Sequence, residues 1–246
     1  MLRSALRAVL PAGMKPRRIR AGPLQGCRLV TSWRDYPAAL LGYTELPLMR
    51  WLSSRVASGE TWLDVGAHYG YTSVALSRLV GAEGRVFAFE PVLETAGHLS
   101  ATRRINGLSH LTVVPLGLSS AADLTAIEAP LVRGMADHGR AAQAASTTIL
   151  VVALDSVWGR LASQRRDVHG VKIDVQGMEL ETVTGMRHVL AASHPQLVIE
   201  FHAGVERERL LGTLETLGYR LPGLPVDPVA GEPPGVYMDD RSYSFV

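Results

Sequence analysis

Cysteine is almost absent from this 246-residue chain, in which Cys27 is the only one. A single thiol excludes an internal disulfide and a cysteine-cluster metal site, and it fits a reducing compartment. No apolar run reaches the roughly 20 residues that span a membrane, and Arg3 and Arg7 interrupt the apolar start of the chain, so no secretory signal is predicted. We therefore expect a cytoplasmic protein.

Acidic residues are missing from the first 34 positions, which hold eight basic ones: Arg3, Arg7, Lys15, Arg17, Arg18, Arg20, Arg28 and Arg34. This leaves 17 of the chain's 25 basic residues against 23 acidic ones, so the remainder is net acidic. An acid-free basic start is typical of a transit peptide, of contact with anionic lipid or a phosphorylated substrate, or of a solvated tail. Because the positive charge does not extend over the body, nucleic acid is not an expected partner.

Residues 61–70, Thr-Trp-Leu-Asp-Val-Gly-Ala-His-Tyr-Gly, predict a strand, a glycine turn and the start of a helix. Such a turn lets backbone N–H groups approach a ligand closely, because Gly66 has no Cβ. A second apolar run ends at Glu90, where a carboxylate can accept hydrogen bonds from ribose hydroxyls. The pattern indicates an adenosine-containing cofactor, and the alternative is a tight turn without a ligand.

The glycine spacing distinguishes between such cofactors. A dinucleotide fingerprint needs G-x-G-x-x-G, but the first glycine position here is Asp64 and only Gly66 and Gly70 remain. The pattern D-x-G-x-x-x-G followed by a strand-end acid resembles motif I of class I S-adenosylmethionine methyltransferases. In that motif the first acid lies near the methionine end of the cofactor.

Apolar runs and helical periodicities alternate along the chain, which is 47% hydrophobic and can bury the core of one α/β domain. We expect helices at 42–56, 71–80, 92–106, 155–163, 178–191 and 205–217, and strands within 22–31 and at 61–66, 85–90, 111–116, 147–153, 169–175 and 196–202. Residues 119–145 are expected to form a loop. A hairpin of 219–221 with 241–246 would close a mostly parallel, Rossmann-like sheet. We divide the chain into a basic arm with a capping segment, 1–58, and a cofactor-binding domain, 59–246.

Two strand ends carry candidate catalytic residues. The side-chain period of two puts Asp174 on the same side as Lys172, and His202 on the same side as Glu200, near the predicted cofactor. Methyl transfer to a hydroxyl needs a base, and either Asp174 or His202 could serve, or each could have a structural role. Two acids on separate strands are weak evidence for Mg²⁺, so no metal is expected.

Six segments in register resemble the FkbM family of S-adenosylmethionine-dependent methyltransferases. They are Gly42-Tyr-Thr-Glu45, Asp64 to Thr72, Phe89-Glu-Pro91, Ala153 to Val157, Lys172-Ile-Asp-Val-Gln-Gly-Met-Glu179 and Ile199-Glu-Phe-His202. The resemblance implies a class I fold, S-adenosylmethionine as cofactor, and O-methylation of a sugar, glycolipid or polyketide-type small molecule. It implies cofactor contacts from Asp64, Gly66, His68, Gly70, Thr72 and Glu90. Two residues depart from the family pattern: His68 replaces the usual Asn, and Gln176 the usual Glu.

Three alternative functions have distinct signatures. A nicotinamide-dependent oxidoreductase shares the fold but not the Asp64 position of the turn. A nucleic-acid or protein methyltransferase is suggested only by the basic start, and the Asn/Asp-Pro-Pro-aromatic segment of base-amine enzymes does not follow the fourth core strand. A non-catalytic cofactor-binding protein is the third alternative. Nothing in the sequence predicts an oligomeric state.

Overall fold

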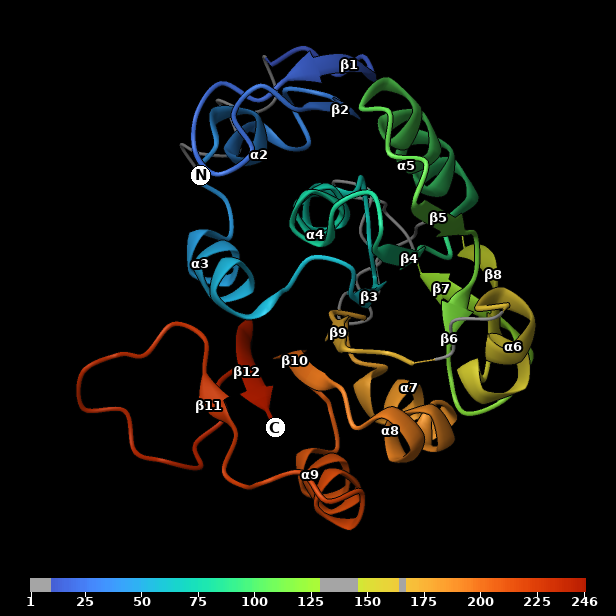
Figure 1. Cartoon of the computed structure of the whole chain (residues 1–246), viewed down its shortest axis with the longest axis vertical. Helices are drawn as coiled ribbons and strands as arrows, with labels where there is room; N and C mark the ends of the chain where they lie inside the picture. Colours follow the sequence, from blue (N-terminus) through green and yellow to red (C-terminus); the bar gives the residue numbers. More distant parts are fainter. Residues whose placement is uncertain (1–9, 129–145, 164–166) are drawn as a thin grey trace.

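The computed structural model describes residues 10–128, 146–163 and 167–246, with a seven-stranded sheet at the centre (Figure 1). The strands follow the order β11-β12-β10-β9-β3-β4-β5. Their bounds are β3 (Thr61–Val65), β4 (Arg85–Phe89), β5 (Leu111–Val114), β9 (Gly170–Ile173), β10 (Gln196–Phe201), β11 (Leu224–Pro225) and β12 (Arg241–Phe245). Strands β5, β4, β3, β9 and β10 pair in parallel, and β12 is antiparallel to both of its neighbours. The predicted mostly parallel sheet with a reversed strand near its edge is confirmed.

Helices cover both faces of this sheet (Figure 1). One face carries α2 (Pro37–Leu41), α3 (Leu46–Arg55), α4 (Tyr71–Val80) and α5 (Leu93–Ile105). The other carries α6 (Leu154–Leu161), α7 (Glu179–Gly185), α8 (Arg187–Ser193) and α9 (Arg207–Thr216). Successive side chains of a strand point to opposite faces, so Leu63 and Val65 belong to the apolar cluster of α6 to α9 and Trp62 to that of α3 to α5.

The N-terminal segment is part of the folded body from residue 10 onward. Strands β1 (Lys15–Arg18) and β2 (Arg28–Thr31) form an antiparallel hairpin, and α5 anchors it, since Thr102 Oγ1 accepts from the Val30 N–H at 2.9 Å. Leu29 is fully buried with Trp62 and Val74 in one cluster. The alternative of a solvated tail is therefore wrong for residues 10–34, while residues 1–9 lie outside the described residues.

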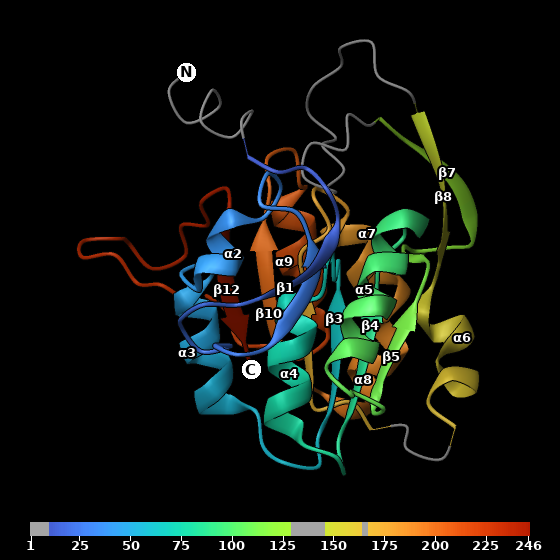
Figure 2. The same ribbon diagram turned by 90° about the horizontal axis from the view of Figure 1, so that it is seen from above.

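A second small sheet flanks the carboxyl ends of the central strands. It consists of β6 (Gly117–Leu118), β8 (Ser146–Val152) and β7 (Asp123–Glu128), in that order. Figure 2 shows β7 and β8 extending beyond the central sheet. The predicted strand at 147–153 is confirmed, but the loop prediction is wrong at 123–128, where β7 pairs with β8; residues 129–145 lie outside the described residues.

Three further predictions need correction. The helix predicted at 42–56 begins only at Leu46, because Gly42 ends α2 and Glu45 caps α3 in a left-handed conformation. The helix predicted at 178–191 divides at Met186 into α7 and α8. Residues 219–221 form no strand, since the Tyr219 N–H caps α9 by donating to Leu214 O; the hairpin strand is instead β11. Among the described residues, no helix is long and apolar enough to cross a membrane.

Candidate functional site

The turn between β3 and α4 packs against the end of β9. Gly66 has a φ of +85°, and a Cβ there would lie 1.8 Å from the backbone oxygen of Asp174, so only glycine permits this approach. His68 follows with a φ of +50°, and its N–H donates to Glu90 Oε2 at 2.8 Å. Glu90 Oε1 accepts from the Val92 N–H at 3.0 Å. The Glu90 carboxyl group thus joins the turns that follow β3 and β4.

Glu90 is nearly buried, with 5% of its surface exposed. Burial raises the pKa of its carboxyl group to about 7, although the two backbone N–H donors and Lys172 oppose the shift. Each carboxyl oxygen uses one lone pair on the backbone and keeps another. Glu90 can therefore still accept hydrogen bonds from a ligand.

A pocket opens beside Glu90, between the central sheet and the small sheet. Its polar lining comes from predicted site residues, His68, Glu90 and Asp174, together with Gln176. Its apolar wall includes Phe89, Val92, Leu118, Ile127, Ile149 and Val151. The sequence predictions named none of these apolar residues as part of the site, because an apolar pattern such as that of Ile149 and Val151 indicates a strand but not the sheet that it joins.

The other predicted cofactor residues lie behind the pocket. Asp64 is fully buried and Thr72 is 5% exposed, and neither lines the pocket. Gly70, with a φ of +89°, caps α4, and a Cβ there would lie 2.2 Å from a methyl group of Leu99. These residues shape the turn rather than border the cavity.

Asp64 forms a buried charge network with Lys172. Asp64 Oδ2 accepts from the Ser73 hydroxyl at 2.5 Å, and Asp64 Oδ1 lies 3.7 Å from Lys172 Nζ, which contacts Asp174 Oδ2 at 3.0 Å. Burial lowers the pKa of Lys172, but the charges of Asp174, Asp64 and Glu45 outweigh it and hold the pKa above its ordinary value. Asp64 and Lys172 are opposite each other in the register of β3 and β9, so the two parallel strands place this pair.

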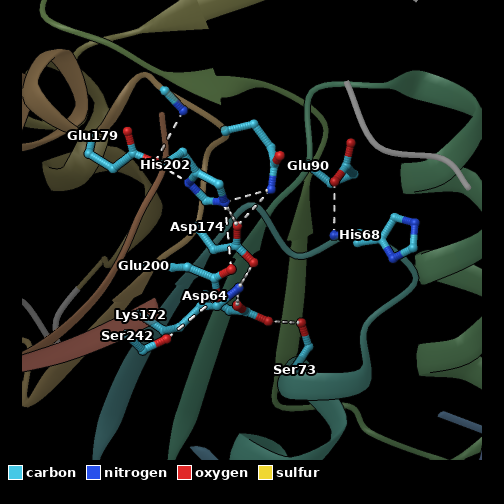
Figure 3. Close-up of polar contacts among 12 residues, drawn as sticks. Asp64, His68, Ser73, Glu90, Lys172, Asp174, Glu179, Glu200, His202 and Ser242 are labelled. Carbon is cyan, nitrogen blue, oxygen red and sulfur yellow. Dashed lines mark hydrogen bonds and ion pairs between the residues drawn. The ribbon is translucent and has the colours of Figure 1, made fainter. Parts of the chain in front are cut away.

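His202 lies at the centre of a second polar network (Figure 3). Its Nδ1 lies 2.7 Å from Oε1 of Glu179, which is fully buried. Its Nε2 faces Asp174 Oδ1 at 3.5 Å, Glu200 Oε1 at 3.6 Å and the amide nitrogen of Gln176 at 2.9 Å. The structure thus brings the two predicted catalytic residues together and adds Glu179, which the sequence predictions missed.

The carboxyl groups around His202 favour positive charge there. Burial lowers the pKa of His202, but hydrogen bonds to Glu179 and Glu200 and the charge of Asp174 outweigh this and raise it to about 10. Burial likewise raises the pKa of Asp174, but Lys172 and His202 outweigh it, so that the pKa lies below its ordinary value. The side of His202 that bears Nε2 is therefore a position where a cationic group is stabilised.

Three residues close to these networks have strained backbone conformations. Six described residues other than glycine have a positive φ, and Glu45, His68 and Gln176 are three of them. Such conformations are unfavourable for side chains with a Cβ and concentrate at functional sites. Glu45 is close enough to Lys172, Asp174 and Glu200 for their charges to act on its pKa, which burial raises to about 7.

Comparison with known proteins identifies the family. The model of the methyltransferase FkbM domain matches residues 64–221. The hexuronic acid methyltransferase AglP of Haloferax volcanii is 30% identical over 165 residues, which are 66% of this chain and 64% of AglP. The structure of methyltransferase FkbM from Methylobacillus flagellatus KT matches at 17% identity and a TM-score of 0.51, over 88% of this chain and 61% of that one.

A third match is the precorrin-6y C5,15-methyltransferase structure from Geobacter metallireducens GS-15, at 17% identity and a TM-score of 0.50, covering 82% of this chain and 86% of that one. These structures show the class I methyltransferase fold. The chain spans less than two thirds of the length of AglP and of the FkbM structure. Because the family model covers well over half of the residues, the chain belongs to the FkbM methyltransferase family.

Proposed function

We propose that the protein is an S-adenosylmethionine-dependent methyltransferase that acts on a hydroxyl group of a sugar or a sugar-containing molecule. The observation that carries the proposal is the pocket between the two sheets, which Glu90 and Asp174 border together with an apolar wall. The similarity to a hexuronic acid methyltransferase supports a sugar as acceptor. The family match argues against the nicotinamide alternative.

The residues of the pocket fit the cofactor. The remaining lone pairs of Glu90 suit the two ribose hydroxyls, and the apolar wall around Val92, Leu118 and Ile149 suits the faces of an adenine ring. The carboxyl group of Asp174 provides negative charge for a sulfonium. When bound, S-adenosylmethionine supplies an electrophilic methyl group.

Asp174 is the predicted catalytic residue that borders the pocket, whereas His202 lies behind it and does not line the cavity. We therefore assign contact with the acceptor hydroxyl to Asp174, and the role of positioning Asp174 to His202 and Lys172. Holding a nucleophile in line with the methyl group contributes most of the rate in such a displacement. A hydroxyl is favoured over a carboxylate acceptor, because Asp174 and Glu200 would repel a second anion.

Calorimetry of the full chain with S-adenosylmethionine, with its demethylated product and with NADH tests the cofactor. We expect binding of the first two, and binding about tenfold weaker or more in Glu90→Ala, since loss of two ribose hydrogen bonds removes at least about 1.4 kcal/mol. Glu94→Ala, which changes an exposed acid outside the pocket, is the matched control. Binding of NADH alone, or of no nucleotide by a folded protein, would refute the proposal.

Mass spectrometry of sugars and glycans incubated with protein and cofactor tests the acceptor. The expected result is a mass increase of one CH₂ unit that alkaline ester hydrolysis does not remove. A product that loses its methyl group under alkaline hydrolysis would instead be a carboxyl ester and would exclude the hydroxyl acceptor.

A further inference from the structure

Three potential metal ligands converge at the carboxyl ends of β9 and β10. One ligand atom each from Asp174, Glu200 and His202 can be chosen so that all three lie within 4.8 Å of one another. Octahedral coordination with bonds of about 2.1 Å places neighbouring ligand atoms about 3 Å apart and opposite ones about 4.2 Å apart. The 3.5 and 3.6 Å that separate His202 Nε2 from Asp174 and Glu200 need only a small contraction to reach neighbouring positions.

His202 is oriented as metal-binding histidines usually are. His202 Nδ1 lies 2.7 Å from Glu179 Oε1, and the amide nitrogen of Gln176 lies 2.9 Å from Nε2. In the neutral ring that donates its Nδ1–H to Glu179, the lone pair of Nε2 would face a bound cation, which would take the place of the Nε2 proton. A carboxylate on one ring nitrogen fixes the tautomer and leaves the lone pair of the other for a metal. Glu179 is fully buried, and its Oε1 also accepts from the Gly177 N–H at 3.1 Å, so a second donor helps to orient its carboxylate.

The carboxyl groups around these three residues outnumber the basic groups. Five carboxyl groups, those of Glu45, Asp64, Asp174, Glu179 and Glu200, face Lys172 and His202. Glu179 Oε2 is buried without a hydrogen-bond partner in the described part of the chain. Unpaired buried carboxylates are costly unless a further positive charge compensates them.

Gln176 occupies the position that such a charge would take. Its amide nitrogen donates to Asp174 Oδ1 at 3.2 Å and lies 2.9 Å from His202 Nε2, so it stands between two of the three ligands. The amide supplies partial positive charge between them, at the cost of a left-handed backbone with a φ of 56°. Rotation of this one side chain would open the position and present its amide oxygen as a further ligand.

We propose that Asp174, Glu200 and His202 form a divalent-cation site, with Glu179 as the residue that positions His202. Two carboxylate oxygens and one imidazole, without thiolate, suit Mn²⁺ best, and Mg²⁺ next. This departs from the expectation of no metal, because the sequence showed two acids on separate strands but not the orientation of His202.

The role of the cation extends the proposed function and rests on it. Asp174 borders the pocket, so a cation beside it would lie where the acceptor hydroxyl binds, and would lower the pKa of that hydroxyl. In the transfer, the hydroxyl proton would pass to the carboxyl group of Asp174, which borders the pocket. The new O–C bond forms as the C–S bond breaks, and its electron pair leaves with the sulfur as a neutral thioether.

Titration of the chelator-treated full-length protein with MnCl₂, without nucleotide or sugar, tests the site. Calorimetry and the electron paramagnetic resonance of free Mn²⁺ should show one bound ion. We expect Glu200→Gln and His202→Ala to weaken binding at least tenfold, and Glu179→Gln to weaken it less, since an amide oxygen can still accept from Nδ1–H. Glu215→Gln, on the exposed side of α9, should bind like the wild type.

Glu200 is partly exposed, with 24% of its side chain accessible, so its variant should fold even if His202→Ala does not. Absence of stoichiometric binding of Mn²⁺, Mg²⁺ and Zn²⁺ to the wild type would overturn the proposal, and so would equal affinity in Glu200→Gln. The nucleotide calorimetry is independent: nucleotide binding without metal binding refutes only this site, and metal binding without nucleotide binding refutes only the proposed function.

Discussion

Replacing Lys172 by methionine is expected to destabilise the protein strongly, because the lysine compensates a fully buried carboxylate. Lys172 is 4% exposed and lies 3.7 Å from Asp64 Oδ1. At that distance and an effective dielectric constant of about 20, the attraction is about 4 kcal/mol. Breaking one partner out of a buried pair typically costs 3–5 kcal/mol, so we expect a loss of about 4 kcal/mol at neutral pH.

The variant also has an expected pH dependence. Without Lys172, the pKa of Asp64 rises further above its ordinary value, because burial already raises it and the largest opposing charge is gone. A carboxyl group with a raised pKa stabilises the folded state at low pH, and the contribution is lost as pH rises through the folded-state pKa. The difference in free energy of unfolding between Lys172→Met and the wild type should therefore shrink as the pH falls from neutral toward about 4.

Urea unfolding followed by tryptophan fluorescence measures these differences, since Trp62 and Trp158 are buried. The double variant Lys172→Met/Asp64→Asn should recover a large part of the loss, with a coupling energy of about 2–3 kcal/mol. Arg85→Met is the matched control, because Arg85 is an exposed cation of β4, and it should change stability by less than about 0.5 kcal/mol. A loss below about 1 kcal/mol for Lys172→Met, or strict additivity with Asp64→Asn, would refute the reasoning.

Three other perturbations test the cofactor side of the site. Burial raises the pKa of Glu90 to about 7, above its ordinary value of 4.5. The free energy of unfolding of the wild type, relative to that of Glu90→Gln, should therefore fall by about 3 kcal/mol as pH rises from about 4.5 to 8. The same pH dependence of the free energy of unfolding in both proteins would contradict this. Gly66→Ala should destabilise the protein by about 3 kcal/mol or more and abolish nucleotide binding, because the new Cβ would clash with the Asp174 carbonyl oxygen. Gly97→Ala in α5 is the control, since a Cβ there meets open space, and thermal unfolding should show a neutral or stabilising effect. Ile149→Asn should weaken S-adenosylmethionine binding about tenfold in calorimetry while Leu150→Asn, on the exposed face of β8, should not, and equal effects of the two would exclude β8 from the pocket wall.

Local signals account for most of the correct predictions of the fold. The helix predicted at 71–80 agrees with α4 at both ends, and the ends of the core parallel strands lie within two residues of the predicted ones. Apolar periodicity and glycine conformation act over short stretches of chain, so they can be read locally. The wrong predictions concern segments whose conformation depends on neighbouring elements. Strand β7 has exposed, weakly patterned residues and depends on β8 for its hydrogen bonds, and Tyr219 caps α9 instead of extending a strand.

The sequence alone determined the order of the core strands and of the helices that connect them, the bend at Gly66 and the acid at the end of β4, because each follows from the conformational preferences of adjacent residues. It also placed Asp174 and His202 at strand ends on one edge of the sheet. Only the tertiary structure decided that Asp64 is buried against Lys172, that Glu179 holds His202, and that β7 and β8 form a wall of the pocket. Those contacts join residues far apart along the chain, and their distances and burial follow from packing, which no local pattern records.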